Sequence, residues 1–239
     1  MKIIRHIPNT ITCCNLLSGC LSIVYLVSGN FFMAGIMIVV AAVFDFFDGF
    51  AARLLDAKSP IGAELDSLCD VVSFGVAPSF IVLRLLRFFD EITIYGHHYV
   101  AYSAFLLAVF AAVRLAKFNI DTRQTTSFIG LPTPAMAIFV ATLSIALTFA
   151  TKDSWFYAAV FNPWFMLGVV AVFSFLMVSE IPFPSLKLKN LWFKGNEALY
   201  IILVLSMLAV NLLGLFGLPF VILIYIVVSL VNSTIRRFD

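Results

Sequence analysis

Two short segments of this 239-residue chain place acids where the surrounding sequence is apolar. DFFDGFAAR runs from Asp45 to Arg53, and GAELDSLCD runs from Gly62 to Asp70. An ionised side chain at the centre of a membrane helix costs about 2.5–3.5 kcal/mol, and such groups are kept where they face a cavity, a partner or an ion. These two segments are therefore the candidate site.

In each segment the acids share one helix face with small residues. In the first, positions i, i+3, i+4 and i+7 are Asp45, Asp48, Gly49 and Ala52. In the second, positions i, i+4 and i+8 are Gly62, Asp66 and Asp70. Residues at these spacings are neighbours on a helix surface. Glu64 lies off this face, and we expect it at the membrane rim.

The two predicted helices are joined by a short link, 54–61, so they run antiparallel. Pairing residues at equal depth places the four aspartates within about 6 Å of depth, because a helix rises about 1.5 Å per residue. Carboxylates this close do not all stay ionised without a counter-charge, and oxygen ligands favour Mg²⁺ or Mn²⁺. The spacing predicts one or two such ions. Ion pairs of the acids with Arg53 and Lys58 are the alternative.

The composition is that of a membrane protein. The chain is 62% hydrophobic and 12% charged, against about 45–50% and about 25% in soluble domains. This excludes a soluble enzyme, and the net charge of +2 leaves no basic surface for nucleic acid. We predict an all-α integral membrane protein of about eight transmembrane helices, at Thr10–Val27, Phe31–Leu54, Gly62–Leu86, Tyr99–Phe118, Pro134–Ala150, Phe165–Val178, Glu197–Leu213 and Leu218–Ile235.

Basic residues orient the predicted spans. With the N-terminus inside, the outer side keeps only Arg84, Arg87 and Lys152, and the other Lys and Arg residues lie on the cytoplasmic side. This distribution follows the positive-inside rule. It predicts a multi-pass protein with both termini and the acidic site on the cytoplasmic side. The adjacent His97 and His98 fall in an outer loop without a third metal ligand, which favours a solvated loop.

The combined pattern Asp45-x-x-Asp48-Gly49-x-x-Ala52-Arg53, eight residues, then Gly62-x-x-x-Asp66-x-x-x-Asp70 resembles the signature of the CDP-alcohol phosphatidyltransferases. Members of that family are helical membrane enzymes, usually homodimers, that move a phosphatidyl group from a CDP-linked lipid to an alcohol and release CMP. The resemblance implies a single membrane domain over residues 1–239, made of the family core and two additional C-terminal helices within membrane lipid.

The resemblance also implies roles for the residues of the pattern. It makes Asp70 the general base, and it gives as metal ligands, for what are then expected to be two ions, Asp45, Asp48, Asp66 and Asp70. It gives as the CDP-binding residues Asp45, Gly49, Ala52, Arg53, Gly62 and Asp66. Such metal ions can clamp a diphosphate and stabilise the leaving nucleotide.

Flanking segments resemble the family members that use L-serine as the alcohol and CDP-diacylglycerol as the lipid donor. These segments are PNTITCCN from Pro8, VSFGVAP from Val72, RLAKFN from Arg114 and FIGLPTPA from Phe128. We expect acceptor binding at Arg114, Lys117 and Asn119, with the two cations holding the serine carboxylate. Positive-inside anchoring is the alternative for both cations.

Two other functions fit part of the pattern. The acceptor could be glycerol 3-phosphate or inositol phosphate, but a phosphate calls for several basic residues, and the sequence offers few beyond Arg114 and Lys117. Membrane acids also occur in divalent-cation transporters, which often carry paired broken helices in both halves of the chain. Here the acids occur in one half only.

Overall fold

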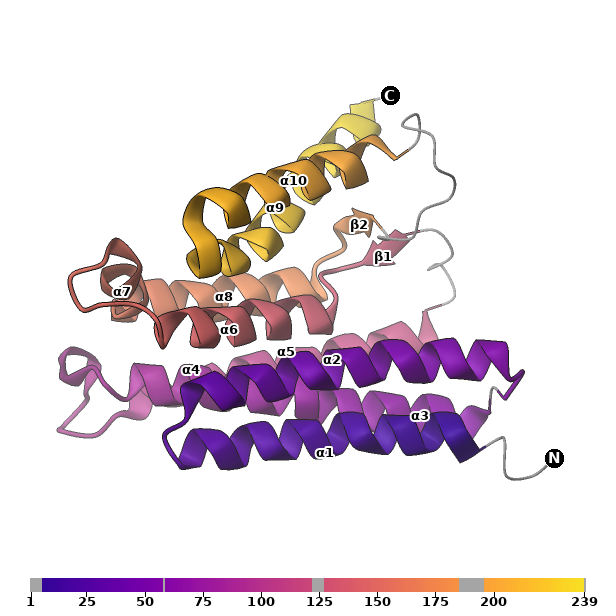
Figure 1. Ribbon diagram of the computed structural model, residues 1–239, viewed down its shortest axis with the longest axis horizontal. Helices are drawn as coiled ribbons and strands as arrows, with labels where there is room; N and C mark the ends of the chain where they lie inside the picture. Colours follow the sequence, from indigo (N-terminus) through magenta and orange to yellow (C-terminus); the bar gives the residue numbers. More distant parts are fainter. Residues whose placement is uncertain (1–5, 58, 122–126, 185–195, 239) are drawn as a thin grey trace.

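The computed structural model describes residues 6–57, 59–121, 127–184 and 196–238 (Figure 1). The α-helices are α1 (Ile7–Val27), α2 (Phe31–Leu54), α3 (Pro60–Asp70), α4 (Ala77–Leu86), α5 (Leu106–Ile120), α6 (Thr133–Leu147), α7 (Trp155–Val160), α8 (Pro163–Val178), α9 (Glu197–Leu213) and α10 (Leu218–Phe238). A π-helical segment, Val71–Val76, joins α3 to α4 without a break, and short 3-10 helices cover Asp90–Ile92, Tyr99–Phe105 and Gly214–Gly217. The strands are β1 (Ser127–Ile129) and β2 (Pro182–Pro184).

These helices form a multi-pass membrane protein. Five continuous helical stretches are long and apolar enough to span a bilayer, at Ile7–Val27, Phe31–Leu54, Pro60–Leu86, Tyr99–Ile120 and Glu197–Thr234. The last stretch is α9 and α10 joined by a tight turn, and α6 and α8 are shorter apolar helices. Over the described residues, an apolar helix therefore lies at each of the eight predicted positions, which confirms the all-α membrane fold.

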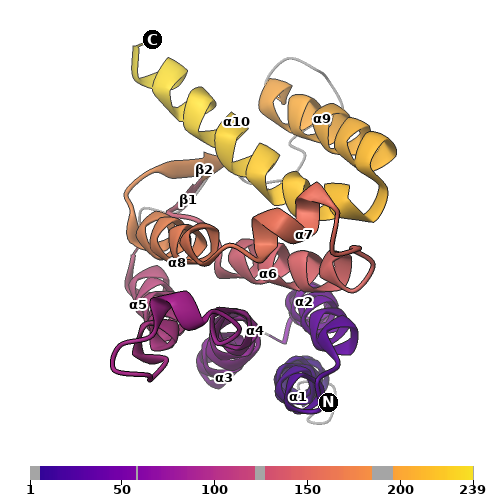
Figure 2. The ribbon, with the colours of Figure 1, turned by 90° about the vertical axis from the view of Figure 1, so that its left-hand side faces the viewer.

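The helices lie in three layers (Figures 1 and 2). One layer holds α1 to α5, the middle layer holds α6 and α8, and α9 and α10 form the third. The start of α1, the α2–α3 connection, the end of α5 and the β1–β2 pair all lie at one end of the molecule. The end of α10 lies at that same end. We call it the site end.

Small residues bring the helices of the first two layers close together. A Cβ added to Gly19 of α1 would lie 2.7 Å from the Cα of Ser73, and one added to Gly35 of α2 would lie 2.6 Å from the carbonyl oxygen of Ala141 in α6. Small residues at such contacts let helix backbones approach one another within a membrane. These contacts hold α1 against the segment that follows α3, and α2 against α6.

Two features were not predicted. Strands β1 and β2 form a small antiparallel sheet whose register pairs Phe128 with Phe183. The short helix α7 lies between α6 and α8 in the chain. Pro182 and Pro184 cannot continue a helix because proline lacks the N–H that a helix needs. The segment after α8 is therefore extended, and it pairs with the segment that precedes α6.

Candidate active site

Three of the four predicted aspartates come together where α2 and α3 meet at the site end. One carboxylate oxygen from each of Asp45, Asp48 and Asp66 lies within 4.8 Å of the others. Asp48 is only 5% exposed. One oxygen of Asp48 and one of Asp66 are buried and accept no hydrogen bond from any described residue. The site thus holds concentrated negative charge with buried oxygens that lack a donor.

Asp70 lies outside this group of three. It is buried, 7% exposed, and its Oδ1 accepts a hydrogen bond of 3.0 Å from Nδ2 of Asn15 in α1. Asn15 is itself fully buried. The sequence places Asp70 one turn deeper than Asp66. The structure adds the hydrogen bond from Asn15, which comes from a third helix, α1. The spacing of Asn15 within PNTITCCN did not predict this bond to Asp70.

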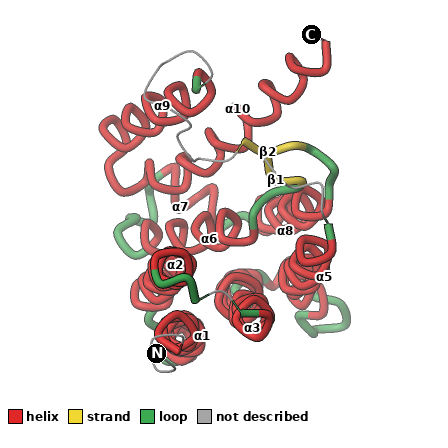
Figure 3. Tube along the Cα trace, turned by 90° about the vertical axis from the view of Figure 1, so that its right-hand side faces the viewer, coloured by secondary structure: helices red, strands yellow, loops and turns green. Residues whose placement is uncertain are grey.

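A cavity of about 220 Å³ is lined by residues from the starts of α1 and α3, the end of α2 and the α2–α3 connection. These three helices are neighbours in Figure 3. The cavity contains five of the predicted nucleotide and metal residues: Asp48, Gly49, Ala52, Gly62 and Asp66. It also contains three polar residues that had no predicted role: Asn9, Thr12 and Ser59. Asp45 and Arg53, which we expected at the nucleotide, are not among its lining residues, and Arg53 is exposed.

The two glycines of this cavity differ in how much room surrounds them. A Cβ on Gly62 would lie 3.0 Å from Oγ of Ser59 and 3.1 Å from Oδ1 of Asn9, whereas a Cβ on Gly49 would meet nothing within 4 Å. Ser59 caps α3 by accepting a hydrogen bond from the Gly62 N–H. Gly62 therefore serves the cap of α3 as well as the cavity, and Gly49 leaves open space.

A second cavity, of about 380 Å³, lies between the end of α5 and the end of α8. Arg114 and Lys117 both line it, together with Asp121, Ile129 and Glu180. We call it the α5–α8 cavity. Asn119, the third predicted acceptor residue, does not line this cavity. Its Nδ2 instead donates a hydrogen bond of 2.9 Å to Oγ of Ser67 in α3.

Among the charged residues that line the α5–α8 cavity, Arg114 is the most deeply buried. It is 7% exposed, its Nη1 donates 3.3 Å to Oγ1 of Thr133, and its guanidinium carbon lies 5.4 Å from the ring centre of Phe118. Its Nε is buried and has no hydrogen-bond acceptor in the described structure. Arg114 thus lies buried beside the α5–α8 cavity, with Nη1 partnered and Nε unpartnered among the described residues.

The π-helical segment follows Asp70 directly. A Cβ on Gly75 would lie 3.2 Å from Cβ of Ala111 and 3.4 Å from Cα of Ala108, so the segment touches α5 closely. Single π-helical turns within helices are frequent at functional sites. Here the π-helical segment begins directly after the predicted base, Asp70, and packs against α5, the helix that carries Arg114.

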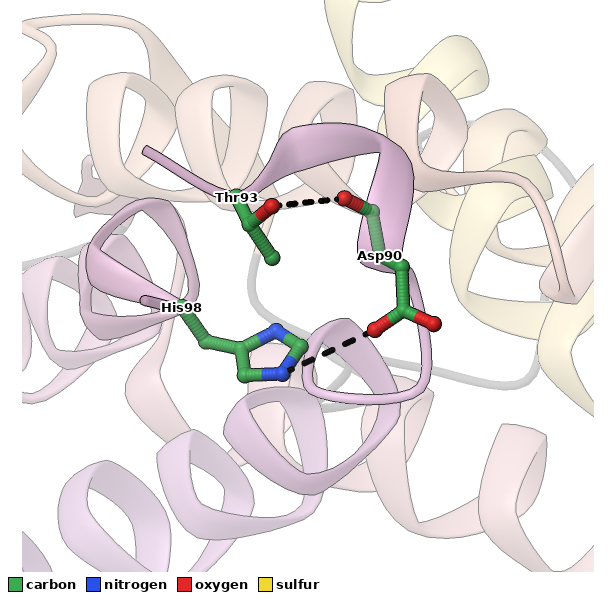
Figure 4. Close-up of polar contacts among 3 residues, drawn as sticks. All are labelled: Asp90, Thr93 and His98. Carbon is green, nitrogen blue, oxygen red and sulfur yellow. Dashed lines mark hydrogen bonds and ion pairs between the residues drawn. The ribbon is translucent and has the colours of Figure 1, made fainter. Parts of the chain in front are cut away.

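The histidines of the opposite end form no comparable site. His98 Nε2 lies 3.9 Å from the Asp90 carboxylate, and Thr93 donates 2.9 Å to the Asp90 carbonyl oxygen (Figure 4). Within the described residues, the group of potential metal ligands that converges is the three aspartates, without either histidine.

Comparison with known proteins identifies the kind of protein to which this site belongs. A family model described as CDP-alcohol phosphatidyltransferase matches residues 5–178. The chain belongs to the CDP-alcohol phosphatidyltransferase family. The match contains α1 to α8, and α9 and α10 lie beyond it.

Individual members of this family are similar over most of the chain. A CDP-diacylglycerol--serine O-phosphatidyltransferase of Helicobacter pylori strain J99 is 37% identical over 182 residues, which cover 75% of this chain and 72% of the relative. One of Bacillus subtilis is 34% identical, covering 77% and 92%. An archaetidylserine synthase of Methanothermobacter thermautotrophicus is 30% identical, covering 74% and 69%. The predicted family and the prediction of a transferase enzyme are confirmed, which sets aside the transporter.

Proposed function

We propose that this CDP-alcohol phosphatidyltransferase transfers the phosphatidyl group of CDP-diacylglycerol to the hydroxyl of L-serine, giving phosphatidylserine and CMP. The observation that carries the proposal is the convergence of Asp45, Asp48 and Asp66 beside a cavity lined by small residues. The names of the relatives support serine as the acceptor, and they include a protein named for archaetidylserine.

The three aspartates fit a divalent cation. Buried oxygens of Asp48 and Asp66 lack a hydrogen-bond donor among the described residues, and a set of carboxylate ligands suits Mg²⁺ or Mn²⁺. Asp45, Asp48 and Asp66 would hold the ion, which when bound supplies positive charge to the diphosphate and to the departing CMP. Two ions, with Asp70 as a further ligand, remain the prediction of the sequence pattern.

The cavity beside these residues would take the CDP group. Gly49 leaves room for the nucleotide to approach α2, since apart from the neighbouring turns of α2 no atom of the described residues lies within 4 Å of where its Cβ would be. Asn9, Thr12 and Ser59 line the same cavity and offer hydrogen-bonding groups to a ribose or a base. Arg53, exposed at the end of α2, would act from outside the cavity as a charge near the phosphates.

Asp70 would act as the general base. The serine oxygen attacks the phosphorus that carries the diacylglycerol, a new P–O bond forms, and the P–O bond to CMP breaks. The proton of the serine hydroxyl passes to Asp70, which has to lie within hydrogen-bond distance of it. Asn15 holds Oδ1, so we assign proton acceptance to Oδ2.

Arg114 and Lys117 would hold the serine carboxylate. The buried Nε of Arg114 lacks an acceptor among the described residues, and a guanidinium binds a carboxylate through two parallel hydrogen bonds. The π-helical segment after Asp70 lies against Ala111 of α5, about one turn before Arg114, which supports placing the acceptor near the base. Asn119 is proposed only as a link between α5 and α3, because its amide donates to Ser67.

The remaining proposals concern the whole molecule. We propose that the site and both termini face the cytoplasm, which is supported by the basic residues near the site end and by the position of α1's start and α10's end at that end. We also propose a homodimer and a single membrane domain over 1–239. Cross-linking in native membranes and accessibility labelling of single cysteines would test these points.

CMP release by the purified protein tests the proposed reaction. CDP-diacylglycerol and Mn²⁺ or Mg²⁺ are supplied with L-serine, glycerol 3-phosphate or inositol phosphate in turn. We expect CMP release that depends on serine and stops on chelation. Equal or faster release with a phosphorylated alcohol would overturn the choice of acceptor, and release that survives complete chelation would overturn the role of the metal.

A further inference from the structure

The α5–α8 cavity carries charges of both signs. Arg114 and Lys117 line it from α5, and Glu180 lines it from the segment that follows α8. Asp121, at the end of α5, lines it as well. Its volume of about 380 Å³ falls in the range of about 300–1,000 Å³ for small-molecule sites. Walls with charges of both signs suit a ligand that carries both a negative and a positive group.

The negative group of the ligand belongs at Arg114. This side chain is 93% buried, since 7% is exposed, and its Nε has no acceptor among the described residues. Its Nη1 is held by Thr133 at 3.3 Å. Buried donors in proteins nearly always have a partner, so a guanidinium at a cavity wall, with Nη1 held by Thr133 and Nε without an acceptor, is suited to bind an anion.

The positive group of the ligand belongs at Glu180. Glu180 is exposed and lines the cavity, and among the described residues no ion pair joins it to Lys117, which lines the same cavity. Asp121 already makes another interaction, which leaves Glu180 as the acid for a ligand. A carboxylate at this place attracts an ammonium group and repels a phosphate.

The wall that carries Glu180 is held in place by backbone hydrogen bonds. Gly130 N–H donates 2.9 Å to the Ile181 carbonyl, and Leu131 N–H donates 2.9 Å to the Leu176 carbonyl. Gly130 has φ +77°, and a Cβ there would lie 2.5 Å from the Met177 carbonyl oxygen. The turn after α8, which carries Glu180, is thereby held against the segment that leads into α6.

From this arrangement we infer that the α5–α8 cavity binds serine as a zwitterion, with Glu180 holding its ammonium group and Arg114 and Lys117 its carboxylate, and that Glu180 selects serine over phosphorylated alcohols. The inference rests on the proposed serine transfer and adds the residue that determines specificity. Glycerol 3-phosphate has no ammonium group for Glu180, and its phosphate would be repelled there.

The experiment compares two acceptors in the wild-type protein and in Glu180→Gln. The acceptors are L-serine and 3-hydroxypropionate, which is serine without its amino group, and the readout is the KM of each from CMP release. Loss of a hydrogen bond between charged groups corresponds to about a tenfold change in binding. We expect the wild-type KM to be about tenfold higher for 3-hydroxypropionate than for serine.

Glu180→Gln should raise the KM for serine about tenfold and leave the KM for 3-hydroxypropionate and for CDP-diacylglycerol within twofold. Asp153→Asn removes the same charge from an exposed residue of the loop before α7, and this control should match the wild type. Glu180→Asp should recover part of the serine affinity, because it restores the charge.

The possible failures can be told apart. An unchanged serine KM in Glu180→Gln, or an equal rise for both acceptors, overturns the inference and leaves the serine transfer intact. A wild-type protein that releases no CMP on addition of serine overturns the proposed function instead. If Glu180→Gln does not fold, equal wild-type KM values for the two acceptors would overturn the inference on their own.

Discussion

Replacing Asn15 by Ala removes the hydrogen bond that holds the proposed base. The bond joins Asn15 Nδ2 to Asp70 Oδ1 over 3.0 Å, and both side chains are buried. A hydrogen bond to a charged group contributes about 1.5–3 kcal/mol. If this stabilisation is needed to keep Asp70 ionised and oriented in the transition state, kcat should fall roughly 10- to 150-fold.

The assay is CMP release at saturating CDP-diacylglycerol and serine, with KM measured for each. We expect both KM values to stay within twofold of the wild type, because Asn15 lines neither cavity. Asn162→Ala is the matched control. Asn162 caps α8 by accepting hydrogen bonds from Trp164 and Phe165, so its loss should lower Tm without lowering kcat.

Two results would refute the reasoning. A kcat for Asn15→Ala within twofold of the wild type would mean that Asp70 needs no support from α1. A parallel rise in the KM for CDP-diacylglycerol would mean that the substitution deforms the nucleotide cavity instead of releasing the base.

Three further substitutions or treatments test other parts of the site. Asp70→Asn should abolish turnover and leave CDP-diacylglycerol binding, measured by equilibrium titration, largely intact; near-normal turnover would reject Asp70 as the base. Chelation should stop CMP release, and added Mn²⁺ should restore it. Asp48→Asn should weaken Mn²⁺ binding at least tenfold in a direct titration, since the charge of one ligand is lost. An unchanged Mn²⁺ affinity would remove Asp48 from the ligand set. Gly130→Ala should destabilise the fold by roughly 1–3 kcal/mol more than Gly29→Ala. Both glycines have positive φ, but only at Gly130 would a Cβ collide with a backbone atom, the Met177 carbonyl oxygen. Equal Tm values for the two variants would contradict this close contact.

The helices could be predicted from the sequence because each is a long apolar run, and the acidic faces because a helix has a fixed periodicity. Asp45 and Asp48 are three residues apart on α2, and the short connection to α3 brings Asp66 to the same depth. No packing information is needed for that convergence. These were the parts of the site for which local geometry alone was sufficient.

The parts that were missed depend on contacts between distant segments. The hydrogen bond that Asp70 accepts comes from Asn15, 55 positions earlier in the chain. Asn9 and Ser59 come together only because α1 packs beside the start of α3. Glu180 meets Arg114 across a cavity that depends on how the segment after α8 turns back. Helix periodicity carries no information about such pairings.

The contact between β2 and α10 bears on any attempt to make a smaller version of this protein. The Phe183 ring is fully buried, and its centre lies 5.8 Å from that of Tyr225 in α10. A chain trimmed after α8, where the family match stops, would lose β2 and so leave β1 without its partner strand. One cut after β2 would instead leave an aromatic ring uncovered three residues from Glu180. In either shortened chain the acidic helices α2 and α3 are retained, and what is removed or uncovered is the packing beside the α5–α8 cavity.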